Sequence, residues 1–235
     1  GEVDMIGLNG EQVQLMKKEN YPVYTYDDGS TFYLEYNMDN KYLSNKNLRK
    51  AITYAIDKQA FIDSIVKNDS QPAVSFTAPA INGLNDKFYK EVGSLQPAFD
   101  TELAKEYYNK ALEELNVDSI SLSLIIDDSD SAVKNGAFVQ EQLKVNLGLD
   151  IKIEPMPFKS RLERMSNKDF DIVFAGWGPD YNDPLTFLDM FETGNGNNHV
   201  SYSNPEYDEL LDKVRTEKDK EKRFEYLKQL EQIVM

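Results

Sequence analysis

The side chains best suited to recognising a ligand stand together in one stretch, where an apolar run ends in a loop. Residues 172–175 read Ile-Val-Phe-Ala and are followed by Gly176, a pattern typical of a buried parallel strand. Trp177, the single tryptophan of the chain, and Asp180 come next. Ligands of open α/β sheets bind where such strands end. Because a carboxylate beside an indole can hold a cationic amine against an apolar wall, this stretch predicts a binding site without an obvious catalytic group.

Two acids of this loop also have a structural interpretation. Asp180 could cap the turn that follows Pro179 rather than bind a ligand. Asp183 is the better candidate for a helix cap, because a helix can begin at Pro184. From the residue pattern alone, ligand binding and capping are equally good interpretations of Asp180.

Trp177, Gly178 and Tyr181 complete the candidate binding loop. A lone tryptophan is more often a core residue than a pocket wall, but Trp177 lies between Gly176 and Gly178 directly after the strand. Glycine at that point lets a ligand backbone approach closely, which favours the pocket. Tyr181 could pack on Trp177 or contact the ligand, and both positions stay open.

Charge and composition exclude several classes of function. The net charge of −15 is unfavourable for a nucleic-acid partner or for docking on anionic lipid, because both need clustered Lys and Arg. The absence of cysteine excludes disulfides, thiolate catalysis and cysteine-based zinc sites within these residues. No apolar run approaches the ~20 residues that a bilayer crossing requires. Residues 1–10 lack the pattern of a signal peptide.

The other chemically reactive residues give weaker signals. His199, the single histidine, lies in a Gly- and Asn-rich segment and is expected to be a solvated loop residue without a Gly-x-Ser-x-Gly nucleophile motif to serve. The cluster Asp127–Asp130 lacks the Gly and closing Glu of an EF-hand loop. A loop with a helix cap is expected there, with adventitious calcium as the alternative. We therefore expect no catalytic residue, no bound metal and no cofactor.

Apolar segments in the second half of the chain predict an α/β fold. Strands alternate there with helices and imply a mainly parallel sheet flanked by helices, with strands at 122–126, 151–153 and 171–175 and helices at 130–146 and 158–166. Further helices are expected at 10–18, 48–55, 102–115, 205–216 and 220–234. The loop-rich segment 68–97 is expected to be a functional surface or a contact between lobes of the protein.

A β-hairpin is expected near the start of the chain. Residues 21–26 alternate in polarity as a half-buried strand would, and residues 27–30 read Asp-Asp-Gly-Ser, a turn signal. Residues 31–36 would then be the partner strand.

Three ordered segments of the chain resemble one known family. They are Gly176-Trp177-x-x-Asp180-Tyr181-x-Asp183-Pro184, Leu48-Arg49-Lys50-Ala51-Ile52-Thr53-Tyr54-Ala55-Ile56-Asp57-Lys58 and Tyr202-Ser203-Asn204-Pro205-Glu206-Tyr207-Asp208. Together they resemble the signature segments of the oligopeptide- and dipeptide-binding proteins of ABC importers, and the resemblance covers nearly the whole chain. It implies a periplasmic-binding-protein-like fold of class II, of which this chain would be the second lobe.

The resemblance also implies a function. Members of this family hold an oligopeptide between two lobes and deliver it to the membrane permease of an ABC transporter. Asp180 would pair with the α-ammonium group of the peptide, and Trp177, Gly178 and Tyr181 would line the binding site. Relatives of this fold bind dipeptides, signalling peptides, nickel complexes or haem, so these ligands stay open as alternatives. A hydrolase that uses carboxylates is a third hypothesis.

Family members are considerably longer, so both ends of this chain look cut. Residues 1–40 would be the crossover between lobes together with the hairpin strands, and residues 41–235 the truncated second lobe. Resemblance to the Gram-positive members implies a protein on the extracellular face of the cell membrane, or in a periplasm. The membrane contact would be a lipid anchor in the missing N-terminal part.

Overall fold

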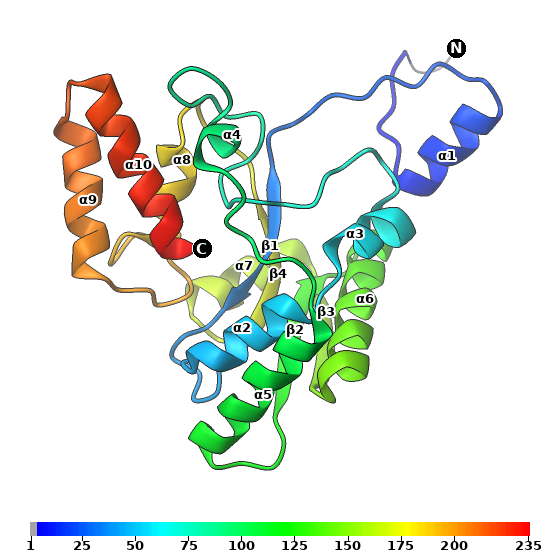
Figure 1. The fold of residues 1–235 in the computed structure, drawn as a ribbon. Helices are drawn as coiled ribbons and strands as arrows, with labels where there is room; N and C mark the ends of the chain where they lie inside the picture. The colour runs from blue at the N-terminus through cyan, green and yellow to red at the C-terminus, as the bar shows by residue number, and fades with distance from the viewer. Residues whose placement is uncertain (1–3) are drawn as a thin grey trace.

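The computed structural model describes residues 4–235 and contains a four-stranded sheet with helices around it (Figure 1). The strands are β1 (Thr31–Tyr36), β2 (Ser121–Asp127), β3 (Asp150–Met156) and β4 (Ile172–Trp177). The longer helices are α1 (Gly10–Lys18), α2 (Lys46–Tyr54), α5 (Thr101–Leu115), α6 (Asp130–Leu147), α7 (Phe158–Ser166), α9 (Pro205–Thr216) and α10 (Lys220–Val234). Shorter helical segments are α3 (Lys58–Phe61), η1 (Ile62–Val66), α4 (Phe88–Val92), α8 (Leu185–Leu188) and η2 (Asp189–Phe191).

The sheet confirms the predicted α/β fold with a mainly parallel core. Its strand order is β1-β4-β2-β3, in which β2 runs parallel to both β3 and β4. The edge strand β1 pairs with β4 in the antiparallel direction, with Phe32 opposite Gly176 and Thr31 opposite Trp177. This pairing brings the segment before β1 to the end of β4, where the candidate binding loop begins.

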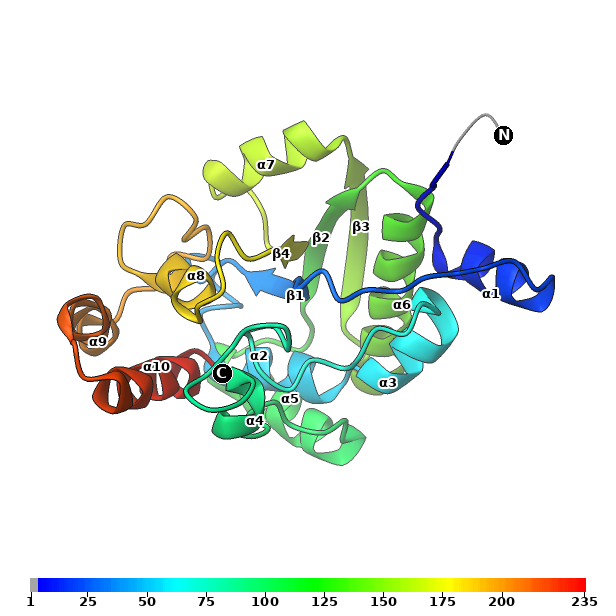
Figure 2. The same cartoon turned by 90° about the horizontal axis from the view of Figure 1, so that it is seen from above.

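Helices cover both faces of the sheet (Figure 2). On one face α2, α5 and α6 pack against apolar side chains of β2 such as Leu124 and Ile126. On the other face Ile125, which points the opposite way from its neighbours, packs with Met165 of α7 and Val173 of β4. Because β2 and β4 are covered on both faces, each contains an apolar run, residues 124–126 and 172–175, and these runs located the strands correctly.

Side-chain caps fix the starts of several helices. Asn45, Asp57 and Asp100 each accept a backbone N–H in the first turn of α2, α3 and α5. Asn204 does the same for α9, which has Pro205 at its first position. Each cap satisfies a donor that the helix itself cannot pair.

A second core lies beside the sheet, among α8, α9, α10 and the segment that precedes α4 (Figure 1). Phe76, Phe187 and Tyr207 are buried there. Glu231 of α10, also buried, accepts hydrogen bonds from the backbone of Phe76 and Thr77. Segment 68–97 is therefore not a surface along its whole length, because aromatic packing and this carboxylate draw residues 76–78 into the core. Its contact with another lobe stays a prediction.

The predicted hairpin was wrong in its first strand. Residues 31–36 form β1 as expected, but residues 21–26 form no strand, and the partner of β1 is β4. Tyr24 and Tyr26 are 89% and 87% exposed. The alternating side chains of residues 21–26 have no apolar surface to pack on, so the local pattern does not produce a strand there.

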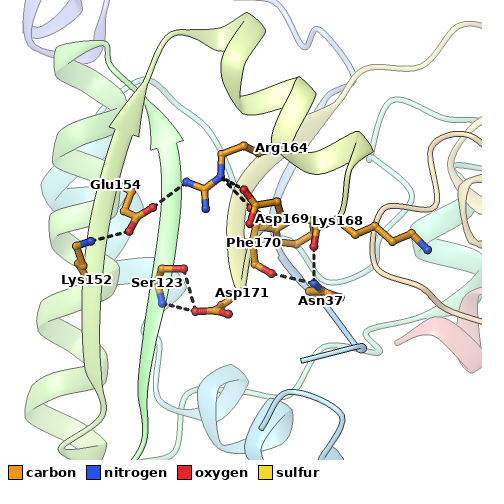
Figure 3. A network of polar contacts seen from close by, with 9 residues as sticks. All are labelled: Asn37, Ser123, Lys152, Glu154, Arg164, Lys168, Asp169, Phe170 and Asp171. Carbon is orange, nitrogen blue, oxygen red and sulfur yellow. Dashed lines mark hydrogen bonds and ion pairs between the residues drawn. The ribbon is translucent and has the colours of Figure 1, made fainter. Parts of the chain in front are cut away.

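A polar network closes the end of the sheet where β2 and β4 begin (Figure 3). Asp171 accepts hydrogen bonds from the backbone N–H and the hydroxyl of Ser123 at 2.8 and 2.9 Å. Asn37 donates to the carbonyls of Lys168 and Phe170 at 3.0 and 2.9 Å. These groups line a recess of about 480 Å³, but they bind one another. These hydrogen bonds therefore fix the ends of the strands. They leave neither Asp171 nor Asn37 free to bind a ligand.

Candidate functional site

The loop after β4 is fixed by its own hydrogen bonds. The indole Nε1 of Trp177 donates to the carbonyl of Thr186 at 2.8 Å, and the backbone N–H of Asp180 donates to Thr186 Oγ1 at 3.1 Å. Thr186 is 2% exposed, in the short helix α8. One buried residue thus holds both Trp177 and the backbone of Asp180.

Trp177 is partly a core residue and partly exposed, so it combines the two interpretations, core and pocket wall, that the sequence offered. It is half-buried and packs against the second core, so part of the ring is a core residue. Its N–H is already used by Thr186 and is not free for a ligand. Its contribution to a site is therefore the remaining exposed surface of the ring.

Asp183 fulfils its expected structural role. Its Oδ1 accepts the backbone N–H of Leu185 at 3.0 Å, at the start of α8. In addition, Arg223 of α10 donates both terminal nitrogens to the Asp183 carboxylate, at 2.8 and 3.0 Å. The negative charge of Asp183 is thus engaged, and this acid connects the loop to the last helix.

Asp180 differs from Asp183 because its carboxylate is exposed and has no hydrogen bond or ion pair with any residue from 4 to 235. Its neighbour Tyr181 is 48% exposed. Partial burial raises the pKa of the Tyr181 phenol, and the carboxylates of Asp189, Asp183 and Asp180 raise it further. Arg223 lowers this pKa in part, so acidic side chains outnumber basic ones around the phenol, as an ammonium group requires.

The segment before β1 packs closely against the loop after β4. Gly29 has a φ of 75°, and a side chain there would lie 3.2 Å from the ring of Pro179. A Cβ on Gly178 would approach Ser30 Oγ at 3.3 Å. A Cβ on Gly176 would lie 2.8 Å from the ring of Phe32, which covers that glycine from the neighbouring strand. A side chain at position 176 would therefore require the Phe32 ring to move.

A cavity adjoins Gly176, and no pattern in the sequence predicted it. It holds about 160 Å³ at the ends of β2 and β4. Aromatic side chains of Phe32 and Phe174 form part of its wall, and its polar lining includes Asp127, Ser131, Asn135 and Arg161. Arg161 Nε donates to Asp127 Oδ1 at 2.7 Å. No local motif indicates this pair, because its members are separated by two elements of secondary structure.

The chain matches a family model described as bacterial extracellular solute-binding proteins, family 5 Middle, over residues 1–199. It belongs to that family. The resemblance predicted from the three sequence segments is thereby confirmed.

Relatives of this family 5 chain include peptide-binding proteins. The oligopeptide-binding protein OppA of Bacillus subtilis is 31% identical over 99% of this chain and 44% of the relative. The structure of Listeria monocytogenes OppA bound to peptide is 36% identical, with a TM-score of 0.88 over 97% of this chain and 44% of that one. The structure of the pheromone receptor PrgZ is 37% identical, with a TM-score of 0.86 over the same shares. The family 5 chain described here thus spans less than half the length of these relatives.

One expectation about another residue of this family 5 protein needs correction. The His199 side chain is only 14% exposed and lies 3.7 Å from the carboxylate of Glu35, which is 7% exposed. His199 is therefore not a solvated loop residue. Its loop is held against the sheet, since Met38 donates its backbone N–H to the carbonyl of Val200 at 3.0 Å.

The cluster at residues 127–130 provides a loop and a helix cap, which confirms the expectation for it. Ser129 is the N-cap of α6 and accepts the backbone N–H of Ala132 at 3.3 Å. Asp127 instead pairs with Arg161. Within residues 4–235 no three His, Cys, Asp or Glu side chains lie close enough together to hold a metal ion, and no helix has the length and apolar character of a membrane span.

Proposed function

We propose that this chain is part of the substrate-binding component of a peptide ABC transporter, which captures oligopeptides between two lobes and delivers them to a membrane permease. In this proposal residues 41–235 belong to the second lobe. Residues 1–40 contain the crossover between lobes, of which residues 1–3 lie outside the described part of the chain. Membership of the solute-binding family and the similarity to proteins named for peptide binding support the assignment.

The unpaired carboxylate of Asp180 is the observation that carries the proposal. It lies beyond the carboxyl end of β4, where ligands of open α/β sheets bind. Its backbone is fixed by Thr186, so the carboxylate needs little reorganisation to meet a ligand. An α-ammonium group that leaves water in a closed cleft needs such a counter-charge. Trp177, Gly178 and Tyr181 then line the space around the first residue of the peptide.

The proposed role is binding and not catalysis. The acid nearest in sequence to Asp180 in this loop, Asp183, is engaged by Arg223 and by the start of α8. It is therefore not available as the second carboxylate that a general acid and base pair would need. The family is likewise described by the binding of solutes.

A receptor for signalling peptides is the second candidate. The pheromone receptor PrgZ is 37% identical to this chain, and the peptide-bound Listeria protein is 36% identical. The amine anchor at Asp180 is the same in both cases, since signalling peptides and nutrient peptides both present an α-ammonium group. The two candidates differ in ligand sequence and not in the chemistry of this anchor.

The proposed location is the outer side of the cell membrane, with a lipid anchor in a part of the protein that precedes this chain, or a periplasm. The family description as extracellular supports the outer location. The net charge of −15 disfavours direct adsorption to anionic lipid, which is consistent with contact through an anchor and a permease.

Calorimetric titration of the intact protein with short peptides tests the proposal. Each peptide is paired with its N-acetylated form, which has the same sequence but no ammonium group. Asp180→Asn keeps the shape of the side chain and removes its charge. Asp118→Asn, an exposed acid before β2 at the other end of the sheet, is the matched control for net charge.

Saturable binding that is lost on acetylation and weakened in Asp180→Asn, but kept in Asp118→Asn, is the expected result. Binding that ignores acetylation and the Asp180 substitution would remove Asp180 from the site. Absence of peptide binding by the unsubstituted protein would contradict the proposed function.

A further inference from the structure

The cavity beside Gly176 contains an ion pair with a buried arginine and with unused hydrogen-bonding capacity. The side chain of Arg161 is 7% exposed, and that of Asp127 is 33% exposed. Both line the cavity of about 160 Å³ together with Phe32 and Phe174. The cavity lies at the carboxyl ends of β2 and β4, on the same edge of the sheet as the Asp180 loop.

The guanidinium of Arg161 is held in one orientation. Nε donates to Asp127 Oδ1 at 2.7 Å, and Nη1 lies 3.1 Å from the sulfur of Met165. The ring of Phe158 covers the guanidinium with its centroid 5.1 Å from Cζ. Among the described residues neither Arg161 Nη2 nor Asp127 Oδ2 has a hydrogen-bond partner. A donor and an acceptor are thus left free on neighbouring groups of one rigid pair.

A primary amide matches this pair with an acceptor and a donor on two separate atoms, whereas a hydroxyl has a single oxygen for both. Its carbonyl can accept from Arg161 while its NH₂ donates to Asp127, because both groups stand at one end of the amide. A carboxylate would be attracted by Arg161 but repelled by the negative charge of Asp127. An ammonium group would be repelled by the positive charge of Arg161. A trans peptide unit points its N–H and C=O in opposite directions and cannot reach both partners.

We propose that the Arg161–Asp127 pair is a subsite for a glutamine or asparagine side chain of the bound peptide, and this rests on the proposed function. The aromatic walls of Phe32 and Phe174 cover the methylene groups of that side chain. Arg161 donates a hydrogen bond to its amide oxygen, and Asp127 accepts one from its amide nitrogen. The subsite makes the protein selective at one position of the peptide, in addition to the amine anchor.

The test uses tetra-alanine peptides in which one residue at a time is Gln, Glu or Met, three side chains of nearly the same shape. Their affinities are measured by calorimetry with the intact protein. Because hydrogen bonds to charged groups contribute about 1.5–3 kcal/mol, the Gln peptide is expected to bind roughly ten-fold or more tightly than the Glu and Met peptides at one position. This comparison needs no substitution in the protein.

A substitution then reverses the selectivity. In Asp127→Asn the side-chain oxygen still accepts from Arg161 Nε, but the cavity now presents two donors and no carboxylate. We expect the Glu peptide to bind more tightly than the Gln peptide in this variant. Asp128→Asn, an exposed acid one residue away that does not line the cavity, is the control and keeps the preference for Gln.

The outcomes separate this subsite from peptide capture itself. Equal affinities for the three peptides at every position, or an unchanged Gln-to-Glu ratio in Asp127→Asn, would overturn the subsite while peptide binding stands. Failure of all the peptides to bind the unsubstituted protein would overturn both. An equal reversal in Asp128→Asn would attribute the effect to net charge and also overturn the subsite.

Discussion

The Trp177 indole donates a hydrogen bond to the backbone carbonyl of Thr186 at 2.8 Å, and the hydroxyl of Thr186 accepts the Asp180 N–H at 3.1 Å. A residue of α8 therefore sets the position of both the aromatic ring and the acid of the candidate loop. The loop is short, but its geometry depends on a helix that follows it.

Thr186→Val should weaken the binding of peptides more than it weakens the fold. Valine has the shape of threonine but cannot accept the Asp180 N–H, so the loop loses its fixed orientation. Since one hydrogen bond contributes about 0.5–1.5 kcal/mol, a loss of affinity of roughly three- to ten-fold is expected in calorimetry. Thr186→Ser keeps the acceptor and is the control. Equal affinity in the Val and Ser variants would show that this contact does not position the anchor.

The ion pair between Asp183 and Arg223 should couple the loop to α10. Both side chains are 29% exposed, so solvent screens the pair, and its bidentate geometry offsets part of that loss. A double-mutant cycle with Asp183→Asn and Arg223→Met is expected to give a coupling free energy of about 1 kcal/mol in urea unfolding. The coupling should decrease at high salt. Additive effects of the two substitutions would contradict a connection between these elements.

Glu231 should make the stability of the protein depend on pH. Burial raises the pKa of its carboxyl above the ordinary value of 4.5, although hydrogen bonds from Thr77 and Phe76 partly oppose this. The folded state therefore binds the proton more tightly than the unfolded state. The stability contributed in this way is complete below pH 4.5 and is lost as the pH rises through the folded-state pKa.

Glu231→Gln tests this dependence because it keeps the buried contacts. The amide oxygen can accept the N–H groups of Phe76 and Thr77, and the amide nitrogen can donate to Thr77 Oγ1, which lies 2.6 Å from the native carboxylate. Urea unfolding from pH 4 to 8 should show stability rising in the variant relative to the native protein as pH increases. Glu231→Ala leaves two buried N–H groups unpaired and should cost about 1–3 kcal/mol for each. Parallel pH profiles of the Gln variant and the native protein would refute the prediction.

Gly176→Ala should act through Phe32. The added Cβ would lie 2.8 Å from the Phe32 ring, which is 66% exposed and free to swing away. Replacing Gly by Ala in a strand otherwise stabilises it by roughly 0.5–1 kcal/mol. We therefore expect Gly176→Ala to stabilise the protein in a Phe32→Ala background and to give less or no stabilisation in the native background. Thermal unfolding measures both, and the same change in the two backgrounds would rule out the contact.

The amino-acid sequence by itself determined those features that depend on near neighbours. The apolar runs at residues 124–126 and 172–175 located β2 and β4, since strands covered on both faces bury side chains of both. Helix starts followed from Asn45, Asp100 and Asn204, because capping acts within one turn. Three short segments, at residues 48–58, 176–184 and 202–208, also identified the family, and the second of them contains the candidate amine anchor.

The tertiary structure decided what depends on contacts between distant segments. The partner of β1 is β4 and not residues 21–26, since strand pairing follows the apolar surface available for burial. His199 is enclosed beside Glu35 because its loop returns to the end of β1. Asp127 and Arg161 meet only because β2 and α7 converge at one edge of the sheet. No spacing along the chain encodes that meeting, so the cavity they line emerged only from the fold.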